Sequence, residues 1–161
     1  MSPFALLAFA ILLAPARPAG DCPFTACEVS SFGTGTGVCS TSTLQASFTS
    51  EDCRLALSFA PDDFICGNTF LTQHLLIVGI QPIPAGVGVG PQFIEGSRLY
   101  VVPLAVIGPL PGASSSFKLP SAPALLGLPF YLQAAPTFVT TVSLPIVPET
   151  GLSSALELTL L

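Results

Sequence analysis

The segment Leu44–Phe59 reads LQASFTSEDCRLALSF and decides the fold expected for this chain. Residues 44–49 alternate apolar Leu, Ala and Phe with Gln, Ser and Thr, and residues 54–59 alternate Leu, Leu and Phe with Arg, Ala and Ser. A period of two is typical of strands with one buried face. The polar run SED at residues 50–52 between them is typical of a turn. The segment therefore predicts an antiparallel hairpin or two neighbouring antiparallel strands.

Strand signals continue to the C-terminus, interrupted by Pro and Gly. They are the apolar run 75–80, which suits a central strand buried on both faces, the runs 99–102 and 115–119, and the alternating stretches 128–134 and 156–160. Residues 121–127 predict one helical turn with Ser121 as N-cap, Pro123 in the first turn and Gly127 at its end. Residues 81–90, QPIPAGVGVG, predict an extended connection between strands. Short strands at this spacing predict an all-β fold, an antiparallel β-sandwich of the immunoglobulin-like or jelly-roll-like kind, as a single domain over residues 21–161.

The composition limits the classes of function open to the chain. Of its 161 residues 50% are hydrophobic and 8% are charged, and four Lys and Arg against nine Asp and Glu give a net charge of −5. Soluble domains carry about 25% charged residues on average, so this chain is depleted. The shortage of basic residues argues against a nucleic-acid surface, which needs clustered Lys and Arg. The high apolar content argues against intrinsic disorder.

The apolar run at residues 4–14 predicts a signal peptide over residues 1–20. The run has eleven residues, whereas a helix needs roughly 20 to cross the bilayer core. Small residues follow it, as cleavage requires. Asp21 stands before Cys22, where a lipoprotein signal would place a small residue. We therefore expect a secreted or cell-surface product without a lipid anchor, and no membrane span in the mature chain.

All cysteines lie in the first 66 residues of the chain. They are Cys22, Cys27, Cys39, Cys53 and Cys66. Structural zinc normally shows a close Cys pair, which is absent here, so in an exported chain these residues are disulfide candidates. The number is odd, which leaves one thiol over or available to link two chains into a dimer. The connectivity stays open, and we favour a Cys53–Cys66 bridge because the two flank one strand and its turn.

His74 is the only histidine, so any Ser–His–Asp or Cys–His mechanism would have to use it. It stands at the polar entrance to the apolar run 75–80, where a structural or surface role is the usual one. No G-x-S-x-G string accompanies it. We therefore predict that the chain is not an enzyme, has no catalytic residue and takes no cofactor.

Two acidic pairs, Glu51-Asp52 and Asp62-Asp63, fall in predicted turns. Calcium takes oxygen ligands from such loops, and the two turns could meet at one end of a sandwich. Adjacent acids in a turn are more often solvated, and no D-x-D-x-D-G string is present. The four residues are therefore calcium candidates, while a solvated turn is the expected role.

The glycine-rich stretches of the chain are expected to be loops or strand edges, and its long uncharged stretch is expected to be core. Glycine alternates at residues 33–37 and 86–90, but neither stretch leads into a helix as a phosphate loop does. From Phe64 to Ile94 there is no Asp, Glu, Lys or Arg. We expect two buried central strands and their connection here, because sandwich cores draw on both inner faces. An exposed part would mark a partner surface.

The last third of the chain contains short strings in a characteristic order. They are RLYVVP (98–103), GASSSF (112–117), LPSAPALLG (119–127), FYLQA (130–134) and GLSSALELT (151–159). Together they resemble a C-terminal domain common in secreted proteins of environmental bacteria, over about residues 70–161. The resemblance implies a small extracellular β-sandwich, typically without known activity. Members often have Gly-Cys where this chain has Gly96-Ser97, which implies that a partner cysteine among residues 22–66 has lost its bridge.

Two functions follow as expectations. The first is an exported, non-catalytic structural or interaction domain whose partner is a protein or part of the cell envelope. The alternative is a ligand- or glycan-binding β-sandwich, assisted by calcium, because end loops of such folds host many kinds of site. Glycan readers usually stack sugars on exposed aromatic rings, and this chain has no Trp and two Tyr.

Overall fold

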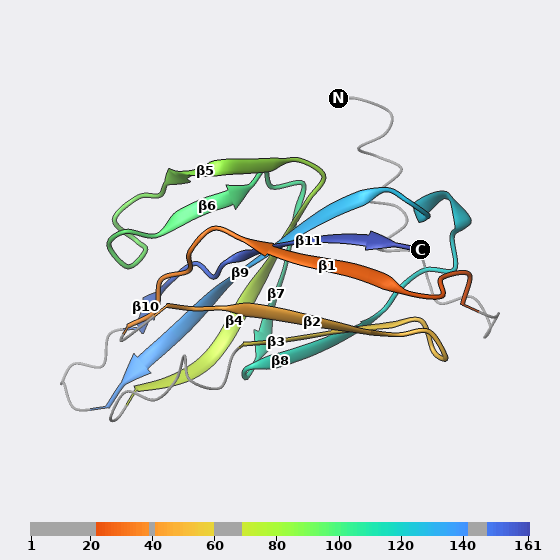
Figure 1. The fold of residues 1–161 in the computed structure, drawn as a ribbon. Helices are drawn as coiled ribbons and strands as arrows, with labels where there is room; N and C mark the ends of the chain where they lie inside the picture. Colours follow the sequence, from red (N-terminus) through yellow and green to blue (C-terminus); the bar gives the residue numbers. More distant parts are fainter. Residues whose placement is uncertain (1–21, 39–40, 60–68, 142–147) are drawn as a thin grey trace.

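The computed structural model describes residues 22–38, 41–59, 69–141 and 148–161, which form an antiparallel β-sandwich (Figure 1). The strands are β1 (Cys27–Phe32), β2 (Leu44–Thr49), β3 (Arg54–Phe59), β4 (Thr69–Gly79), β5 (Pro82–Gly88), β6 (Arg98–Val101), β7 (Ala105–Pro111), β8 (Ser114–Lys118), β9 (Pro129–Thr140), β10 (Pro148–Thr150) and β11 (Ala155–Leu160). The largest sheet has the order β1-β11-β9-β4-β7, with β10 paired to β9. A second sheet has the order β2-β3-β8, and β5 pairs with β6. The predicted signal peptide lies outside the described residues.

The predicted hairpin is confirmed as β2 and β3. The strands are antiparallel, with Leu44 opposite Phe59 and Thr49 opposite Arg54. Leu55 and Leu57 are 3% and 2% exposed, whereas Ala56 between them is only partly buried. The period of two in the sequence thus correctly predicts that one face of this sheet is buried.

The main core lies between the β2-β3-β8 sheet and the inner face of the large sheet. Its fully buried members from β4, β9 and β11 are Leu76, Val78, Leu132, Ala134, Leu156, Leu158 and Leu160. Each fully buried Leu or Val contributes about 1.5–3 kcal/mol relative to an exposed one. The predicted C-terminal strand is confirmed as β11, whose three leucines all face this core.

The outer face of the large sheet is covered by the β5–β6 hairpin, which lies on the side opposite β2, β3 and β8 in Figure 1. Residues 81–90, predicted as an extended connection between strands, contain a strand of their own, because β5 pairs with β6. Because the hairpin covers this face, β4 is buried on both faces at residues 76–79, as predicted for the run 75–80, whereas Ile80 at the end of that run is exposed. Leu76 and Val78 face the main core, and Ile77 packs in an outer cluster with Ala135 and Leu152.

The expectation of two buried central strands in the uncharged stretch is confirmed only in part, for the residues that the structure describes. Residues 76–79 of β4 are buried, whereas β5 is partly or fully exposed along its length. Three of its large apolar side chains are exposed, on different parts of β4, β5 and their turn: Phe70, Ile80 and Val87, at 57%, 51% and 55%. Among the described residues, no helix is long and apolar enough to cross a membrane.

The alternation predicted over residues 128–134 identifies a strand but misplaces its polar face. Leu132 faces the main core, and Tyr131 and Gln133 are also buried, at 7% and 0% exposed. Both point toward the covered outer face, where Tyr131 packs with Tyr100. The sequence pattern around β9 cannot show this burial because the cover comes from β5 and β6, far away along the chain.

The Gln133 side chain joins the covering hairpin to the large sheet. Its Oε1 accepts a hydrogen bond from the backbone N–H of Tyr100 at 2.9 Å. Its Nε2 donates to the carbonyl oxygens of Arg98 at 2.8 Å and Ser153 at 2.9 Å. A buried amide is stable only when such partners are present, and here one side chain satisfies three backbone groups.

The helical turn is confirmed as the 3-10 helix η2 (Pro123–Leu125), but its predicted N-cap is wrong. Ala122 occupies that position in extended conformation, and no side chain caps the helix. A residue that precedes Pro is biased toward extended backbone, which explains why the helix begins one residue later. Gly127 ends the turn with φ +70° and donates its N–H to Leu160.

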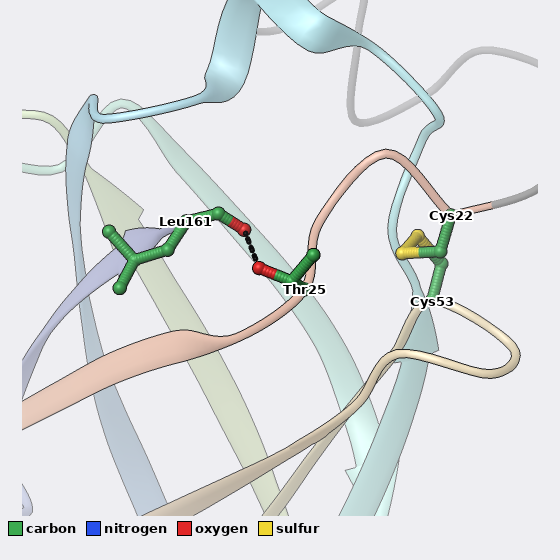
Figure 2. Close-up of a disulfide and its surroundings, with 4 residues drawn as sticks. All are labelled: Cys22, Thr25, Cys53 and Leu161. Atoms are coloured by element: carbon green, nitrogen blue, oxygen red, sulfur yellow. Dashed lines mark hydrogen bonds between the residues drawn. A yellow bond between two sulfur atoms is a disulfide. The ribbon is translucent and has the colours of Figure 1, made fainter.

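The N-terminal segment is fixed by a disulfide between Cys22 and Cys53, with a Cα–Cα distance of 5.1 Å (Figure 2). The prediction of a Cys53–Cys66 bridge is therefore wrong. Backbone bonds from Thr25 and Ala26 to the terminal carbonyl of Leu161 hold the segment ahead of β1 beside the β2–β3 turn. Cys22 is thereby placed next to Cys53. Cys39 and Cys66 lie outside the described residues.

Replacing Gln133 by Met should lower the free energy of unfolding by about 3 kcal/mol or more. The change keeps the side-chain length and leaves three buried backbone groups without partners, each of which costs about 1–3 kcal/mol. Denaturant titration measures the loss, and Gln45→Met on exposed β2 is the control. Faster amide hydrogen exchange at Tyr100 should accompany it. Equal stability of the two variants would contradict the role assigned to Gln133.

Replacing both Cys22 and Cys53 by Ser should cost about 3–4 kcal/mol of unfolding free energy. The bridge closes a loop with a sequence separation of 31, and chain-entropy arguments give that magnitude for such a loop. Urea unfolding of the double variant measures it. Cys27→Ser serves as the control, because this cysteine is free. A loss no larger than that of the control would contradict the stabilising role of the bridge.

Candidate functional site

The outward side of the β2-β3-β8 sheet carries small and polar side chains in three cross-strand rows. We call it the polar face, and it consists of Gln45, Ser58 and Ser114, then Ser47, Ala56 and Ser116, then Thr49, Arg54 and Lys118. Side chains at every second position of a strand share a face, and directly opposed residues are neighbours. Only one of the nine is apolar, so this face is built to meet water or a polar ligand.

A hollow of about 330 Å³ lies on this sheet. Its lining consists of Ser47, Ala56, Leu57, Ser58, Ser114, Ser115 and Ser116. The hollow arises because the middle row has small side chains, whereas Arg54 and Lys118 stand in the row beside it. Small-molecule sites commonly occupy about 300–1,000 Å³. The hollow lies at the lower end of that range, is open to solvent and has hydroxyl groups on its wall.

Two basic residues flank the hollow. Arg54 and Lys118 are directly opposed on β3 and β8. Asp52 accepts from Nε of Arg54 at 2.7 Å, and Nη1 of Arg54 donates to Ser116 Oγ at 3.1 Å. These bonds hold the guanidinium beside the hollow. The Arg54 and Asp52 side chains are 47% and 46% exposed, so the pair itself adds little to stability.

His74 lies between the two sheets rather than in the hollow. Its ring is 2% exposed and meets the Phe59 ring edge-on, with centroids 5.4 Å apart. Nδ1 donates to the carbonyl oxygen of Gly112 at 2.9 Å, so Nε2 accepts from the Ser115 hydroxyl at 3.3 Å. Burial lowers the pKa of His74 below its usual value of 6.5, and the bond to Gly112 opposes this in part.

The His74–Ser115 contact has the chemistry of a base beside a hydroxyl, but its setting is structural. It connects β4 of the large sheet to β8 of the smaller one. Among the described residues the ring has no carboxylate partner, which would stabilise an imidazolium during catalysis. Serine activation would also need donors for an oxyanion. We therefore assign His74 a structural role, in which its ring connects the two sheets.

Two of the four calcium candidates lie in the part of the chain that the structure describes, and two lie outside it. Glu51 and Asp52 lie in the β2–β3 turn, ahead of β3, and are exposed. Asp62 and Asp63 follow β3 in the chain and lie outside the described residues. No group of three or more potential metal ligands occurs within the described ranges. Calcium binding by the four together stays a prediction.

Cys27 is the free cysteine of the described residues and is half-buried on β1. Burial raises the pKa of its thiol, which reduces the thiolate needed for nucleophilic attack or disulfide exchange. It packs against the main core. A dimer linked through an odd cysteine stays a prediction.

The strings that carry the resemblance lie at structural positions. Gly151 approaches the carbonyl oxygen of Thr36 so closely that a Cβ would collide with it. Ser153 Oγ accepts from the N–H of Ala134 at 2.9 Å, and Ser154 Oγ accepts from the N–H of Leu44 at 3.1 Å. Side chains thus replace missing strand hydrogen bonds at the point where β11 begins.

Ser97, where the resembled domain often has Cys, is buried and hydrogen-bonds with Thr36 Oγ1. Cys27 lies at the other end of the β1 region, opposite Leu160, whereas Thr36 lies opposite Leu152. Cys27 is therefore not a neighbour of Ser97 in this structure, and the lost bridge that the resemblance implies stays a prediction.

The sequence reasoning missed Arg54, Ser116 and Lys118 as site residues. Alternation along residues 54–59 already places Arg54 on the outward face, but β8 must be aligned with β3 before Lys118 can be placed opposite it. That alignment joins segments more than fifty residues apart. No protein-family model, curated protein or solved structure matches the chain.

The single histidine offers a direct test of this environment. Its pKa should lie below 6.5 in the folded chain, and NMR titration of its ring proton measures it without ambiguity. A lowered pKa means that the unfolded state binds the proton more readily. His74 therefore supports stability fully above pH 6.5 and less as the pH falls below it. The unfolding free energy of wild type should fall more than that of His74→Gln over this range, and a midpoint at or above 6.5 would contradict the assignment.

Proposed function

We propose that the chain is an exported, non-catalytic interaction domain that binds through the polar face. The observation that carries this proposal is the hydroxyl-lined hollow beside Arg54 and Lys118. Export itself is supported by the apolar run at residues 4–14 and by the disulfide, which is typical of oxidising compartments.

The use of the buried polar groups supports a non-catalytic role. Gln133, Ser153 and Ser154 each satisfy backbone groups, and His74 bridges two sheets. A catalytic group must instead present a reactive atom to a substrate. The polar face differs from these positions because its side chains point to solvent and its concavity is open to a partner.

A glycan- or ligand-binding sandwich is the second candidate, and the hollow favours it. Hydroxyls donate and accept hydrogen bonds, as sugar hydroxyls do. The nine residues of the polar face include no aromatic ring, so binding here would rely on hydrogen bonds and charge instead of stacking. Calcium assistance belongs to this candidate and rests on the four predicted ligands, Glu51, Asp52, Asp62 and Asp63.

Filling the hollow tests the proposed surface. Ala56→Tyr places a large side chain in the middle row, and we expect it to reduce binding of the fluorescently labelled chain to the surface of the producing cells by about tenfold or more. A loss of 1.4 kcal/mol in binding corresponds to that factor. Flow cytometry against chain concentration gives the affinity.

The matched control is Ser30→Tyr, which adds the same ring to exposed β1 outside the polar face. It should bind like wild type. Circular dichroism and melting curves must show that both variants are folded. Unchanged binding of folded Ala56→Tyr, or absence of binding by wild type, would contradict the proposal.

A further inference from the structure

We infer that the ligand of the polar face is an acidic saccharide, one that carries a carboxylate or sulfate group on a hydroxylated ring. The inference rests on the proposed binding role of this face and names the chemistry of its partner. It is carried by the juxtaposition of Arg54 and Lys118 with the hydroxyl-lined hollow.

The placement of positive charge is the first argument. The chain has only four Lys and Arg, yet two of them are directly opposed on neighbouring strands. Like charges in this position destabilise a sheet. Asp52 offsets part of the repulsion through Nε of Arg54. An anion bound between the guanidinium and the ammonium group would offset the remaining repulsion between Arg54 and Lys118. The opposed pair therefore favours an anion-binding role.

The donors of Arg54 are the second argument. Its two side-chain bonds use Nε and Nη1, and among the described residues Nη2 has no protein partner. The bonds also fix the plane of the guanidinium over the hollow side of the sheet, because Ser116 lines the hollow. A positioned guanidinium loses less entropy when it binds an anionic group, and charge-assisted bonds are stronger than neutral ones.

The neighbouring hydroxyls are the third argument, and they distinguish a saccharide from a simple ion. Ser47, Ser58, Ser114 and Ser116 surround the hollow, next to the small side chain of Ala56. Its volume of about 330 Å³ exceeds what a bare carboxylate or sulfate fills, and serine hydroxyls can pair with sugar hydroxyls as donor or acceptor. The basic pair would hold the acidic group while the serines contact the ring.

The net charge of −5 sharpens the inference. A chain of that charge is repelled by a polyanion over most of its surface. Adsorption without a specific site is therefore disfavoured, and binding to an acidic polymer would require a local basic site.

Affinity electrophoresis in gels that contain polygalacturonate, dextran sulfate, neutral dextran or poly-glutamate tests the inference. We expect retardation by polygalacturonate, dextran sulfate or both, and none by dextran. Retardation by polygalacturonate alone would identify the acidic group as a carboxylate, and retardation by dextran sulfate alone would identify it as a sulfate. Arg54→Gln and Lys118→Gln should each weaken binding about tenfold, as expected for loss of one charge-assisted bond. Arg54→Lys should retain part of it, and added salt should weaken it.

Arg98→Gln is the control, since it removes the same charge from β6, on the other side of the large sheet. It should bind like wild type. Stronger binding to poly-glutamate than to the acidic saccharides would overturn the inference in favour of an acidic peptide. Binding that does not depend on Arg54 and Lys118, or no binding to any acidic polymer, would also overturn it. If Ala56→Tyr still abolishes binding to cells, the proposed function survives such a result.

Discussion

The three hydrogen bonds of the Gln133 side chain are the constraint on which the layered arrangement depends. They join β9, at the centre of the large sheet, to the backbone of β6 and to the segment before β11. Other hydrogen bonds also tie this region to the sandwich, among them the backbone bond from Ile94 to Thr150 and the contact of the Ser97 and Thr36 hydroxyls. Without the Gln133 amide, however, buried backbone groups of β6 would lack partners. Because the amide lies in a dry layer, its bonds act without competition from water. The hairpin in turn buries the outer side of β4 and β9, which explains a strand buried on both faces in an antiparallel fold.

The two sides of the molecule therefore use polar residues differently. On the covered side, Gln133, Ser153 and Ser154 satisfy backbone groups that the strand ladders leave unpaired. On the β2-β3-β8 side, polar side chains line an open hollow and two basic residues stand together. Gln133, Ser153 and Ser154 also lie in the strings on which the predicted resemblance rests, and the roles that the structure shows for them are structural. The proposed binding surface draws on the second group and is argued from its own geometry.

Much of the fold could be predicted from local pattern, while most of the candidate site could not. The hairpin of β2 and β3, the doubly buried run in β4 and the leucines of β11 follow from period and apolarity within one segment. Pairing of β5 with β6 was missed because Pro and Gly disguise a strand when its partner is unknown. The Cys22–Cys53 bridge was missed because the spacing of cysteines contains no information on which loop passes over which turn. A structural role is the expectation for His74, and its contacts with Gly112 and Ser115 agree with that expectation.

The all-β class and an antiparallel sandwich could be predicted from the chain alone, since composition and two-residue periodicity are local properties of the sequence. Tertiary structure alone decided that Tyr131 and Gln133 are buried, that Cys53 meets Cys22 and that Arg54 stands opposite Lys118. Each of these depends on contact between residues far apart along the chain, on register between strands or on the cover of one sheet by another. Register sets which side chains become neighbours, so a shift of one residue would turn Lys118 away from Arg54 and remove the candidate site while leaving the same composition.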